Sequence, residues 1–584
     1  MTLNQHQIAR LRGRLAELYG DQADACLARL LTLVSHHPSP GPRHTADWDQ
    51  RDVLLVCYGD QVQAPGRPHL QTLLDFLTAY DLPRSVRQVH LLPFFPSSSD
   101  DGFAVIDYRA VDPELGTWND ISELGRHFEV MFDLVINHVS VSSLWFQNYV
   151  KGEPPYDRFF LEVDPGTDLS RVVRPRSLPL LTSVPTDRGV RHVWMTFSAD
   201  QVDLDYHNPD VLLEMIGVLL LYLQRGARLI RVDAIAYLWK ELGTSCIHLR
   251  PTHVVVKLLR DLVDAVAPGT LLITETNVPH AENVSYFGDG DEAHLVYQFS
   301  LPPLLLEAFV SEDATVLCDW LERLEPARPG TTYLNFTASH DGIGVRPLEG
   351  LLPGERIARL VDAVHQRGGL VSTRRLANGE DAPYELNTTY FDALRNPADA
   401  DPQWHVRRFL ASQAIMLALR GIPAVYFHSL IGTANDSGAV TATGRARSIN
   451  RRKYAADELG RILADPNSVS AQVFNAYRDL LTKRIAQPAF HPDAEQQVRR
   501  FDDPALIGFL RTSLDRRHQI LVMANVSVVS KTVCLDAGRD PPVPRDLLTG
   551  ANMSVADGGI FLEPYQVVWL EWRTTAYDNG GTRP

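Results

Sequence analysis

The sequence has few of the features that mark secreted, membrane-spanning or disulfide-rich proteins. Its five cysteines are scattered, odd in number and free of CxxC pairs, so we expect reduced thiols and no cysteine-ligated metal. No apolar run reaches the roughly 18 residues that a transmembrane helix needs. The first residues follow an amphipathic helical pattern without an apolar signal core, and we therefore expect a cytoplasmic protein.

Positive charge is also scarce. The chain carries 56 Lys and Arg against 71 Asp and Glu, a formal net charge of -15, and it has no long basic run. This balance argues against nucleic acid or an anionic membrane as a partner. If an anion is bound, a few local arginines must bind it despite the repulsion from the negative net charge of the protein. The sequence also lacks internal repeats, a P-loop and a dinucleotide-binding glycine motif.

Short apolar runs alternate with helical patterns along most of the chain. With 584 residues, of which 45% are hydrophobic, more than one domain is expected. Eight strands separated by helices predict an α/β fold, a (β/α)8 TIM barrel. The expected strands are 52–60, 88–94, 130–136, 229–232, 271–275, 294–299, 333–339 and 421–427.

The remaining segments divide the chain into further units. We expect a helical N-terminal extension at 1–50, ending in a His/Pro/Gly-rich linker at 36–44. The barrel would occupy 51–139 and 211–488. A small inserted domain, 140–210, would follow the third strand, and a loop insertion at about 345–400 would separate the seventh strand from the eighth. Long structured insertions at a barrel mouth usually shape access to the site. Short alternating strands predict a C-terminal β-domain at 489–584.

Three carboxylates stand at the ends of predicted strands. Asp233, Glu275 and Asp341 end the fourth, fifth and seventh strands, on the face where such barrels place their chemistry. Arg231 precedes Asp233 by two residues on a buried strand, so both side chains point the same way. Burying the two charges is costly unless each has a partner or a task. A purely structural ion pair at a strand end is the alternative.

Four segments resemble the signature regions of the α-amylase superfamily, glycoside hydrolase family 13, in order and in strand context. They are Asp-Leu-Val-Ile-Asn-His (133–138), Ile-Arg-Val-Asp (230–233), Ile-Thr-Glu (273–275) and Ala-Ser-His-Asp (338–341). Segments 174–179, 201–204, 384–394 and 448–451 are similar to the sucrose phosphorylase subgroup. Segments 243–253, 275–280 and 340–347 look more like its branch of glucosylglycerate phosphorylases.

The resemblance implies a role for each carboxylate. Asp233 would be the nucleophile, Glu275 the general acid/base and Asp341 the transition-state stabiliser. Retaining cleavage of a glycosidic bond needs a nucleophile and an acid about 5–5.5 Å apart. We expect Arg231 to keep Asp233 ionised, and negative neighbours to raise the pKa of Glu275 so that it holds a proton near neutral pH.

The resemblance also implies a pocket for a single glucosyl unit. Asp60, His138, His340 and Arg451 would bind it, and Asp60 with Arg451 would clamp its far hydroxyls and exclude longer glucans. For His138, a core histidine bonded to backbone is the alternative. The expected substrate-binding set is completed by Tyr108, Phe197, Gln201, Arg231 and Asn277.

We expect neither a metal nor a cofactor. Asn137 matches a calcium-ligand position of many α-amylases, but the sucrose phosphorylase group does not use calcium.

The acceptor side decides between attack by phosphate and attack by water. The resemblance assigns phosphate or acceptor binding to Arg176, Tyr237, Tyr384 and Glu385, with inorganic phosphate as co-substrate. A surface salt bridge is the alternative for Arg176.

Three residues depart from the sucrose phosphorylase pattern. Tyr108 and Asn277 replace histidines, and Glu385 replaces a glutamine. Arg374 and Arg375 could bring positive charge to an anionic aglycone or could equally be solvated loop residues.

These observations predict a retaining α-glucoside phosphorylase that releases α-glucose 1-phosphate. The first choice of substrate is 2-O-α-glucosylglycerate, followed by sucrose, sucrose 6'-phosphate and glucosylglycerol. A hydrolase or transglucosidase of the amylosucrase kind is a second hypothesis. A non-catalytic barrel is a third, but it should have lost at least one carboxylate. The protein would act on small molecules as a monomer or homodimer.

Overall fold

The computed structural model describes residues 3–37, 48–376, 379–399, 401–534, 545–553, 555–556 and 559–573. Most of the predicted linker 36–44 and the end of the predicted C-terminal domain lie outside these residues. Within the described ranges, no helix combines the length and apolar character needed to cross a bilayer. The same ranges hold no cluster of three or more His, Cys, Asp or Glu side chains suited to a metal ion.

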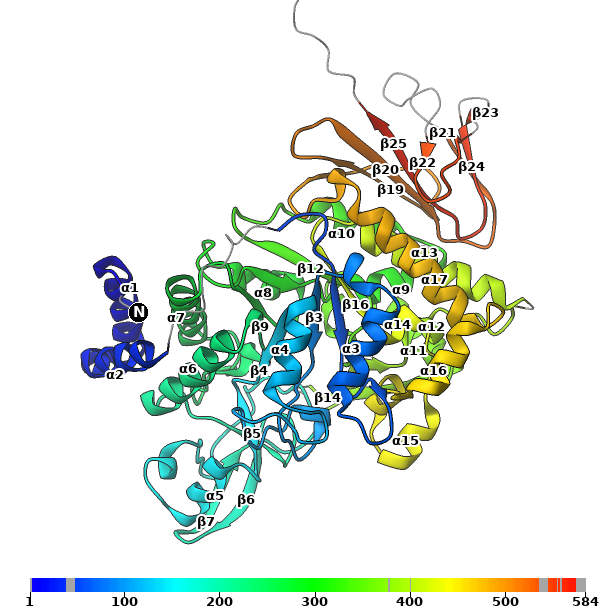
Figure 1. Cartoon of the computed structure of the whole chain (residues 1–584). Helices are drawn as coiled ribbons and strands as arrows, with labels where there is room; N and C mark the ends of the chain where they lie inside the picture. Colours follow the sequence, from blue (N-terminus) through cyan, green and yellow to red (C-terminus); the bar gives the residue numbers. More distant parts are fainter. Residues whose placement is uncertain are drawn as a thin grey trace, which may run out of the picture.

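A closed barrel of eight parallel strands forms the centre of the molecule (Figure 1). All eight predicted strands are present, which confirms the (β/α)8 fold. Nearly all of their residues are buried and most are apolar, as expected for a parallel sheet covered by helices. In chain order they are β1 (Leu54–Cys57), β3 (Gln88–Leu91), β4 (Glu129–Leu134), β9 (Ala227–Val232), β10 (Leu271–Thr274), β11 (Leu295–Tyr297), β12 (Thr332–Phe336) and β16 (Ile422–Tyr426).

Helices surround the barrel and bury their apolar faces against it. The capping box at Thr117, whose N–H is bonded by Asp120 at 2.8 Å, begins one of them. The main surrounding helices are α3 (His69–Ala79), α4 (Trp118–His127), α6 (Pro209–Gln224), α7 (Arg250–Val266), α9 (Leu301–Ser311), α10 (Thr315–Arg323), α13 (Pro402–Ala418) and α17 (Val469–Ile485).

The N-terminal residues form two helices, α1 (Gln5–Tyr19) and α2 (Ala23–His36), that lie beside α7 and α6 in Figure 1. Arg14 pairs with Asp261 of α7 at 3.2 Å. The Tyr19 hydroxyl donates to the Tyr206 carbonyl at 3.1 Å. The extension is therefore an outer layer of the barrel.

Two insertions stand over the mouth of the barrel. The first contains β5 (His138–Ser140), α5 (Leu144–Lys151), β6 (Leu181–Thr186), β7 (Gly189–Trp194) and β8 (Gln201–Asp203). The second contains β13 (Ile343–Gly344), α11 (Gly354–Gln366), β14 (Leu370–Arg375), β15 (Asp381–Asn387) and α12 (Tyr390–Ala393), with its strands in the order β13-β15-β14.

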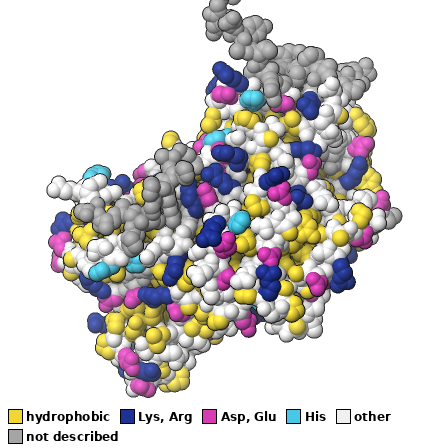
Figure 2. All heavy atoms as spheres, viewed as in Figure 1, with side chains coloured by type: hydrophobic (Ala, Val, Ile, Leu, Met, Phe, Trp, Pro, Cys, Tyr) yellow, Lys and Arg dark blue, Asp and Glu magenta, His cyan; other side chains and the backbone are white. Residues whose placement is uncertain are grey.

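The C-terminal domain consists of two small antiparallel sheets at one end of the barrel (Figure 1). One contains β18 (Glu495–Val498), β19 (Leu506–Thr512), β20 (His518–Asn525), β22 (Arg545–Asp546) and β25 (Val567–Arg573). The other contains β21 (Lys531–Cys534), β23 (Val555–Ala556) and β24 (Gly559–Leu562). On the face shown in Figure 2, acidic and basic side chains are interspersed rather than gathered by sign.

Candidate active site

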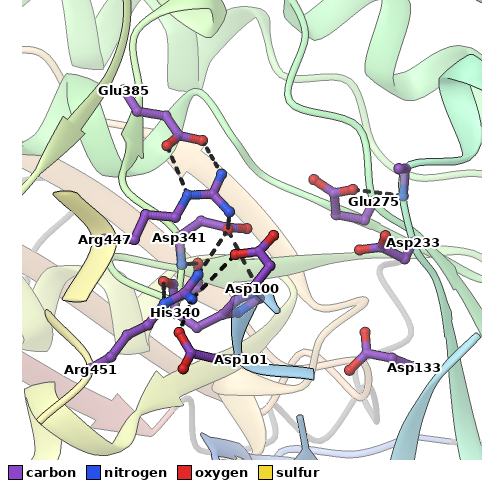
Figure 3. Close-up of polar contacts among 12 residues, drawn as sticks. Asp100, Asp101, Asp133, Asp233, Glu275, His340, Asp341, Glu385, Arg447 and Arg451 are labelled. Atoms are coloured by element: carbon purple, nitrogen blue, oxygen red, sulfur yellow. Dashed lines mark hydrogen bonds and ion pairs between the residues drawn. The ribbon is translucent and has the colours of Figure 1, made fainter. Parts of the chain in front are cut away.

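One cavity at the C-terminal ends of the barrel strands brings the three predicted catalytic carboxylates together. Asp233, Glu275 and Asp341 all line it. They follow β9, β10 and β12, whose carboxyl ends meet on one face because the strands are parallel. Figure 3 shows Asp233 and Glu275 side by side, with Asp341 on the other side of the space between them.

Asp233 is bound by a guanidinium from its own strand. Arg231 Nη1 lies 2.7 Å from Asp233 Oδ1 and 2.5 Å from Asp133 Oδ1 of the neighbouring strand. Asp133 is also bonded to His90 Nε2 at 2.7 Å. Arg231 is buried below the cavity and fixes the carboxylate of Asp233.

Glu275 is held by the backbone that follows Asp233. The N–H of Ala234 donates to Glu275 Oε2 at 2.9 Å. Ala234 has a φ of 50°, a left-handed conformation that costs a non-glycine residue energy and is most often found at functional sites. The strained turn therefore fixes the acid/base candidate relative to the nucleophile candidate.

The two carboxyl groups share one electrostatic environment. Burial raises the pKa of Asp233 well above its usual value; Arg231 opposes this rise, while Glu275 and Asp133 add to it. Burial and the negative charge of Asp341 likewise raise the pKa of Glu275. The pKa of Asp233 is thus raised despite Arg231, contrary to the expectation, because burial outweighs the guanidinium.

A proton shared by this pair is better placed on Glu275. Arg231 Nη2 lies 3.9 Å from Glu275 Oε2, whereas Nη1 is 2.7 Å from Asp233. The nearer guanidinium favours the anion on Asp233. The pair titrates as a unit, and its singly protonated form has the arrangement that retaining chemistry needs.

Asp341 is held in the charged form by a residue that the sequence analysis missed. Arg447 Nη1 lies 2.6 Å from Asp341 Oδ1, and Arg447 also binds Glu385 with Nη2 at 2.5 Å and Nε at 3.1 Å. Burial alone would raise the pKa of Asp341, but Arg447, with Arg231 and Arg451 nearby, lowers it below its usual value. Figure 3 shows the resulting chain from Glu385 through Arg447 to Asp341.

The predicted glucosyl-binding side chains His138, Phe197, Gln201 and His340 line the same cavity. His138 Nε2 is within 3.0 Å of the Phe103 carbonyl and 3.1 Å of Gln201 Nε2. His340 stacks on the Phe103 ring with centroids 4.7 Å apart. Burial lowers the pKa of His340 to about 3, so its ring is neutral at physiological pH.

Asp60 and Tyr108 lie elsewhere. Asp60 pairs with Lys453 at 2.5 Å, and the Tyr108 hydroxyl donates to the carbonyls of Val135 and His138 at 2.8 Å. Neither is among the described residues that line the catalytic cavity. Tyr108 therefore does not contact the cavity, but its hydrogen bonds hold the backbone at Val135 and His138.

Two neighbouring carboxylates, Asp100 and Asp101, lie beside Arg451 of the expected clamp. Asp100 lines the cavity and lies 3.4 Å from Arg451 Nη1, while Arg451 also binds Asp101. Arg451 Nε donates to the His340 carbonyl at 2.9 Å. Arg451 itself lines a neighbouring cavity.

All four predicted acceptor residues, Arg176, Tyr237, Tyr384 and Glu385, line the catalytic cavity. The Arg176 guanidinium lies over the Tyr384 ring at 5.1 Å and 3.7 Å from Glu385 Oε1. Arg176 comes from the first insertion and the other two from β15 of the second. The acceptor end is therefore built by both insertions.

Asn277 connects this end to the acid/base loop. It lines the cavity, and a Cβ added to Gly344 would collide with its amide. Gly344 pairs with Glu385 in the β13–β15 ladder. The loop after Glu275 and the acceptor hairpin are thus in contact at Gly344, where there is no space for a side chain.

Arg374 and Arg375 point away from the chemistry. Arg375 pairs with Asp381 at 3.1 Å, and Arg374 pairs with Glu349. Neither lines the catalytic cavity as far as the described residues show.

Asn137 is satisfied by a lysine. Lys240 Nζ lies 2.8 Å from Asn137 Oδ1 and 2.7 Å from Asp203 Oδ2. All three side chains are buried. The prediction that the protein uses no metal stays a prediction.

Of the missed residues Asp100, Phe103 and Arg447, only Arg447 had a signal in the sequence. Glu385 replaces a glutamine of the resembling family, and a buried extra carboxylate requires a cation nearby. Arg447 lies four residues before Arg451 in a segment already singled out. The direction of Asp100 depends on a loop turn, in which Asp101 has a φ of 48°, and no local pattern predicted it.

Comparison with known proteins gives consistent results. Residues 82–338 match the family model of the α-amylase catalytic domain. The chain is 48% identical to the glucosylglycerate phosphorylase of Allomeiothermus silvanus, over 95% of this chain and 97% of that protein. It is 33% identical to the sucrose phosphorylase of Agrobacterium vitis, over 76% and 90%. The crystal structure of sucrose 6F-phosphate phosphorylase from Thermoanaerobacter thermosaccharolyticum superposes with a TM-score of 0.71, at 27% identity, and covers 82% of this chain and 94% of that one.

Proposed function

Because the chain belongs to the α-amylase family, in its group of glucoside phosphorylases, we propose that it cleaves 2-O-α-glucosylglycerate with inorganic phosphate. The products are α-glucose 1-phosphate and glycerate. The relative at 48% identity over 95% of the chain bears the name of this activity.

The first half-reaction uses the two carboxyl groups beside Arg231. A carboxylate oxygen of Asp233 attacks the anomeric carbon while Glu275 gives its proton to the glycosidic oxygen, and glycerate leaves. The C–O bond to the aglycone breaks as the ester bond to Asp233 forms. Asp341, kept anionic by Arg447, stabilises the positive charge that develops on the sugar ring.

The second half-reaction inverts the anomeric carbon again. A phosphate oxygen attacks this carbon, the bond to Asp233 breaks, and the product has the same α configuration as the substrate. Phosphate competes with water only if cations hold it at this position. Arg176 and Arg447 line the cavity on the acceptor side.

The observation that carries the proposal is the lining of this one cavity. The barrel supplies three carboxylates for glycosidic cleavage, and Arg176, Arg447 and two tyrosines line the same cavity beside them. Glycerate carries a carboxylate that suits the same arginines. A hydrolase has no need of cations on the acceptor side.

The test is release of glucose 1-phosphate by purified enzyme with phosphate from glucosylglycerate, glucosylglycerol, sucrose and sucrose 6'-phosphate. We expect glucosylglycerate to react fastest and Asp233→Ala to abolish the signal. Equal rates with glucosylglycerol would contradict the choice of aglycone. Free glucose, formed at the same rate without phosphate, would favour a hydrolase or transglucosidase.

A further inference from the structure

A second cavity of about 270 Å³ adjoins the catalytic one. The two share a wall formed by Asp100, Arg176, Phe197, Gln201, Glu385 and Arg447. The remaining lining of the second cavity includes Ser99, Ser198 and Ser372 and two further arginines, Arg445 and Arg451. It is thus an antechamber of the active site.

The antechamber has an excess of positive charge in an acidic protein. Its lining contains four guanidinium groups, from Arg176, Arg445, Arg447 and Arg451, against the carboxylates of Asp100 and Glu385. Behind the lining, Asp341 pairs with Arg447 and Asp101 with Arg451. The whole chain carries a net charge of -15. Low-dielectric walls focus such a local field and raise the concentration of anions within it.

Arg445 is the arginine that no mechanism above uses. Its side chain is exposed, and among the described residues it makes no ion pair. It acts electrostatically on Asp101, whose pKa it helps to lower although burial opposes this. Across the cavity, Ser372 Oγ accepts a hydrogen bond from Asn387 at 2.8 Å, which leaves its own hydroxyl hydrogen for an oxyanion.

The inner wall already holds an anion. Glu385 binds Arg447 with both oxygens, at 2.5 and 3.1 Å, and one of these oxygens is 3.7 Å from Arg176. This is the two-point geometry in which a guanidinium binds a carboxylate or a phosphate. Glu385 therefore occupies the Nε and Nη2 donors of Arg447 that an incoming anion would need.

We propose that the antechamber is a docking site for inorganic phosphate, that Arg445 captures the anion, and that Glu385 is the resident carboxylate it displaces from Arg447. The proposal rests on the phosphorylase function above. It assigns Arg445 and Glu385 to binding of the co-substrate, upstream of the glucosyl centre.

The test measures the KM for phosphate at low ionic strength, with the glucoside that responds in the panel above. We expect Arg445→Met to raise this KM about fivefold, the effect of one partly solvated charge contact. The difference shrinks at high salt because the contact is screened. Arg445→Lys keeps the charge and stays near the wild type. Arg461→Met removes an equally exposed arginine from α16 (Ala456–Ala464) and serves as the matched control.

Glu385→Gln provides an independent arm. An amide competes less well than a carboxylate for Arg447, so the KM for phosphate should fall in this variant. A rise would show that Glu385 supports the phosphate site and would overturn its assignment as a displaced anion.

Two other results would overturn the role of Arg445. One is an equal phosphate KM in Arg445→Met and Arg461→Met. The other is a raised KM for the glucoside with an unchanged KM for phosphate, which would assign the arginine to the aglycone carboxylate. Failure of the phosphorylase function itself is distinguishable, because the wild type would then release no glucose 1-phosphate at any phosphate concentration.

Discussion

The glucosyl end and the acceptor end of the cavity are built in different ways. At the glucosyl end, Asp233 and Glu275 follow barrel strands, and Arg231 is bound on both sides, to Asp133 and Asp233. At the acceptor end, Arg176 and Glu385 come from the two insertions. Side chains at the ends of barrel strands are positioned by the barrel itself, whereas Arg176 and Glu385 depend on how the two insertions pack over its mouth. The difference indicates that the barrel supplies the bond-breaking chemistry and the insertions choose the partner of the glucosyl group.

The largest effect should come from removing the cation beneath the glucosyl end. Arg231→Met leaves Asp133 and Asp233 buried without their guanidinium, which costs about 3–5 kcal/mol of folding free energy and about a thousandfold in kcat/KM. His90 and Arg231 together outweigh burial and hold the pKa of Asp133 at about 2. This depressed pKa stabilises the fold above the unfolded value of about 4, and the contribution is lost as the pH falls toward 2.

Urea unfolding at several pH values checks this prediction. The destabilisation should be greatest at neutral pH and smaller at acidic pH, where the orphaned carboxylates take up protons. Arg228→Met is the control, because Arg228 lies on the same strand, 3.7 Å from Glu129. Equal losses in the two variants would contradict the special role of Arg231.

A second, smaller effect concerns the proton at Glu275. Burial and Asp341 raise the pKa of Glu275, and kcat/KM should fall as the pH rises through that pKa because the general acid loses its proton. Glu275→Gln should lower activity on glucosylglycerate by about 10²- to 10⁴-fold. It should spare α-glucosyl fluoride, whose leaving group needs no proton, and abolish the alkaline limb. An alkaline limb that persists with the fluoride would assign it to another group.

Substitutions at the acceptor end should have smaller effects on catalysis. Only the arginines that line the cavity should change the KM for phosphate. Arg176→Met should raise the KM for phosphate about tenfold, since Arg176 lines the cavity. Arg375→Met should change it by less than about twofold, because this half-buried arginine is already paired with Asp381 and does not line the cavity. Steady-state kinetics with varied phosphate distinguish the two. A larger rise in the KM for phosphate in Arg375→Met than in Arg176→Met would contradict the view that only arginines lining the cavity bind phosphate.

Sequence patterns predicted the barrel and its three carboxylates because both follow from burial. Apolar runs of strand length predict the strands, and a charged residue directly after such a run must stand at a strand end. The comparisons support the glucoside phosphorylase function. The acceptor end was only partly predicted.

Burial patterns do not predict the direction of side chains on loops. Asp60 and Asp100 follow neighbouring strands and look equivalent in sequence, yet Asp60 pairs with Lys453 while Asp100 lines the cavity. The pKa of Asp233 also depends on how Arg231 divides its charge between two carboxylates, which only the fold reveals.

Gly344 has a consequence for how this enzyme can change. A Cβ atom at this position would collide with the Asn277 side chain, two residues after Glu275. The acceptor hairpin therefore packs directly against the acid/base loop. A substitution there would force the Asn277 amide to move. Changes of acceptor specificity at this contact therefore require Gly344 and Asn277 to change together.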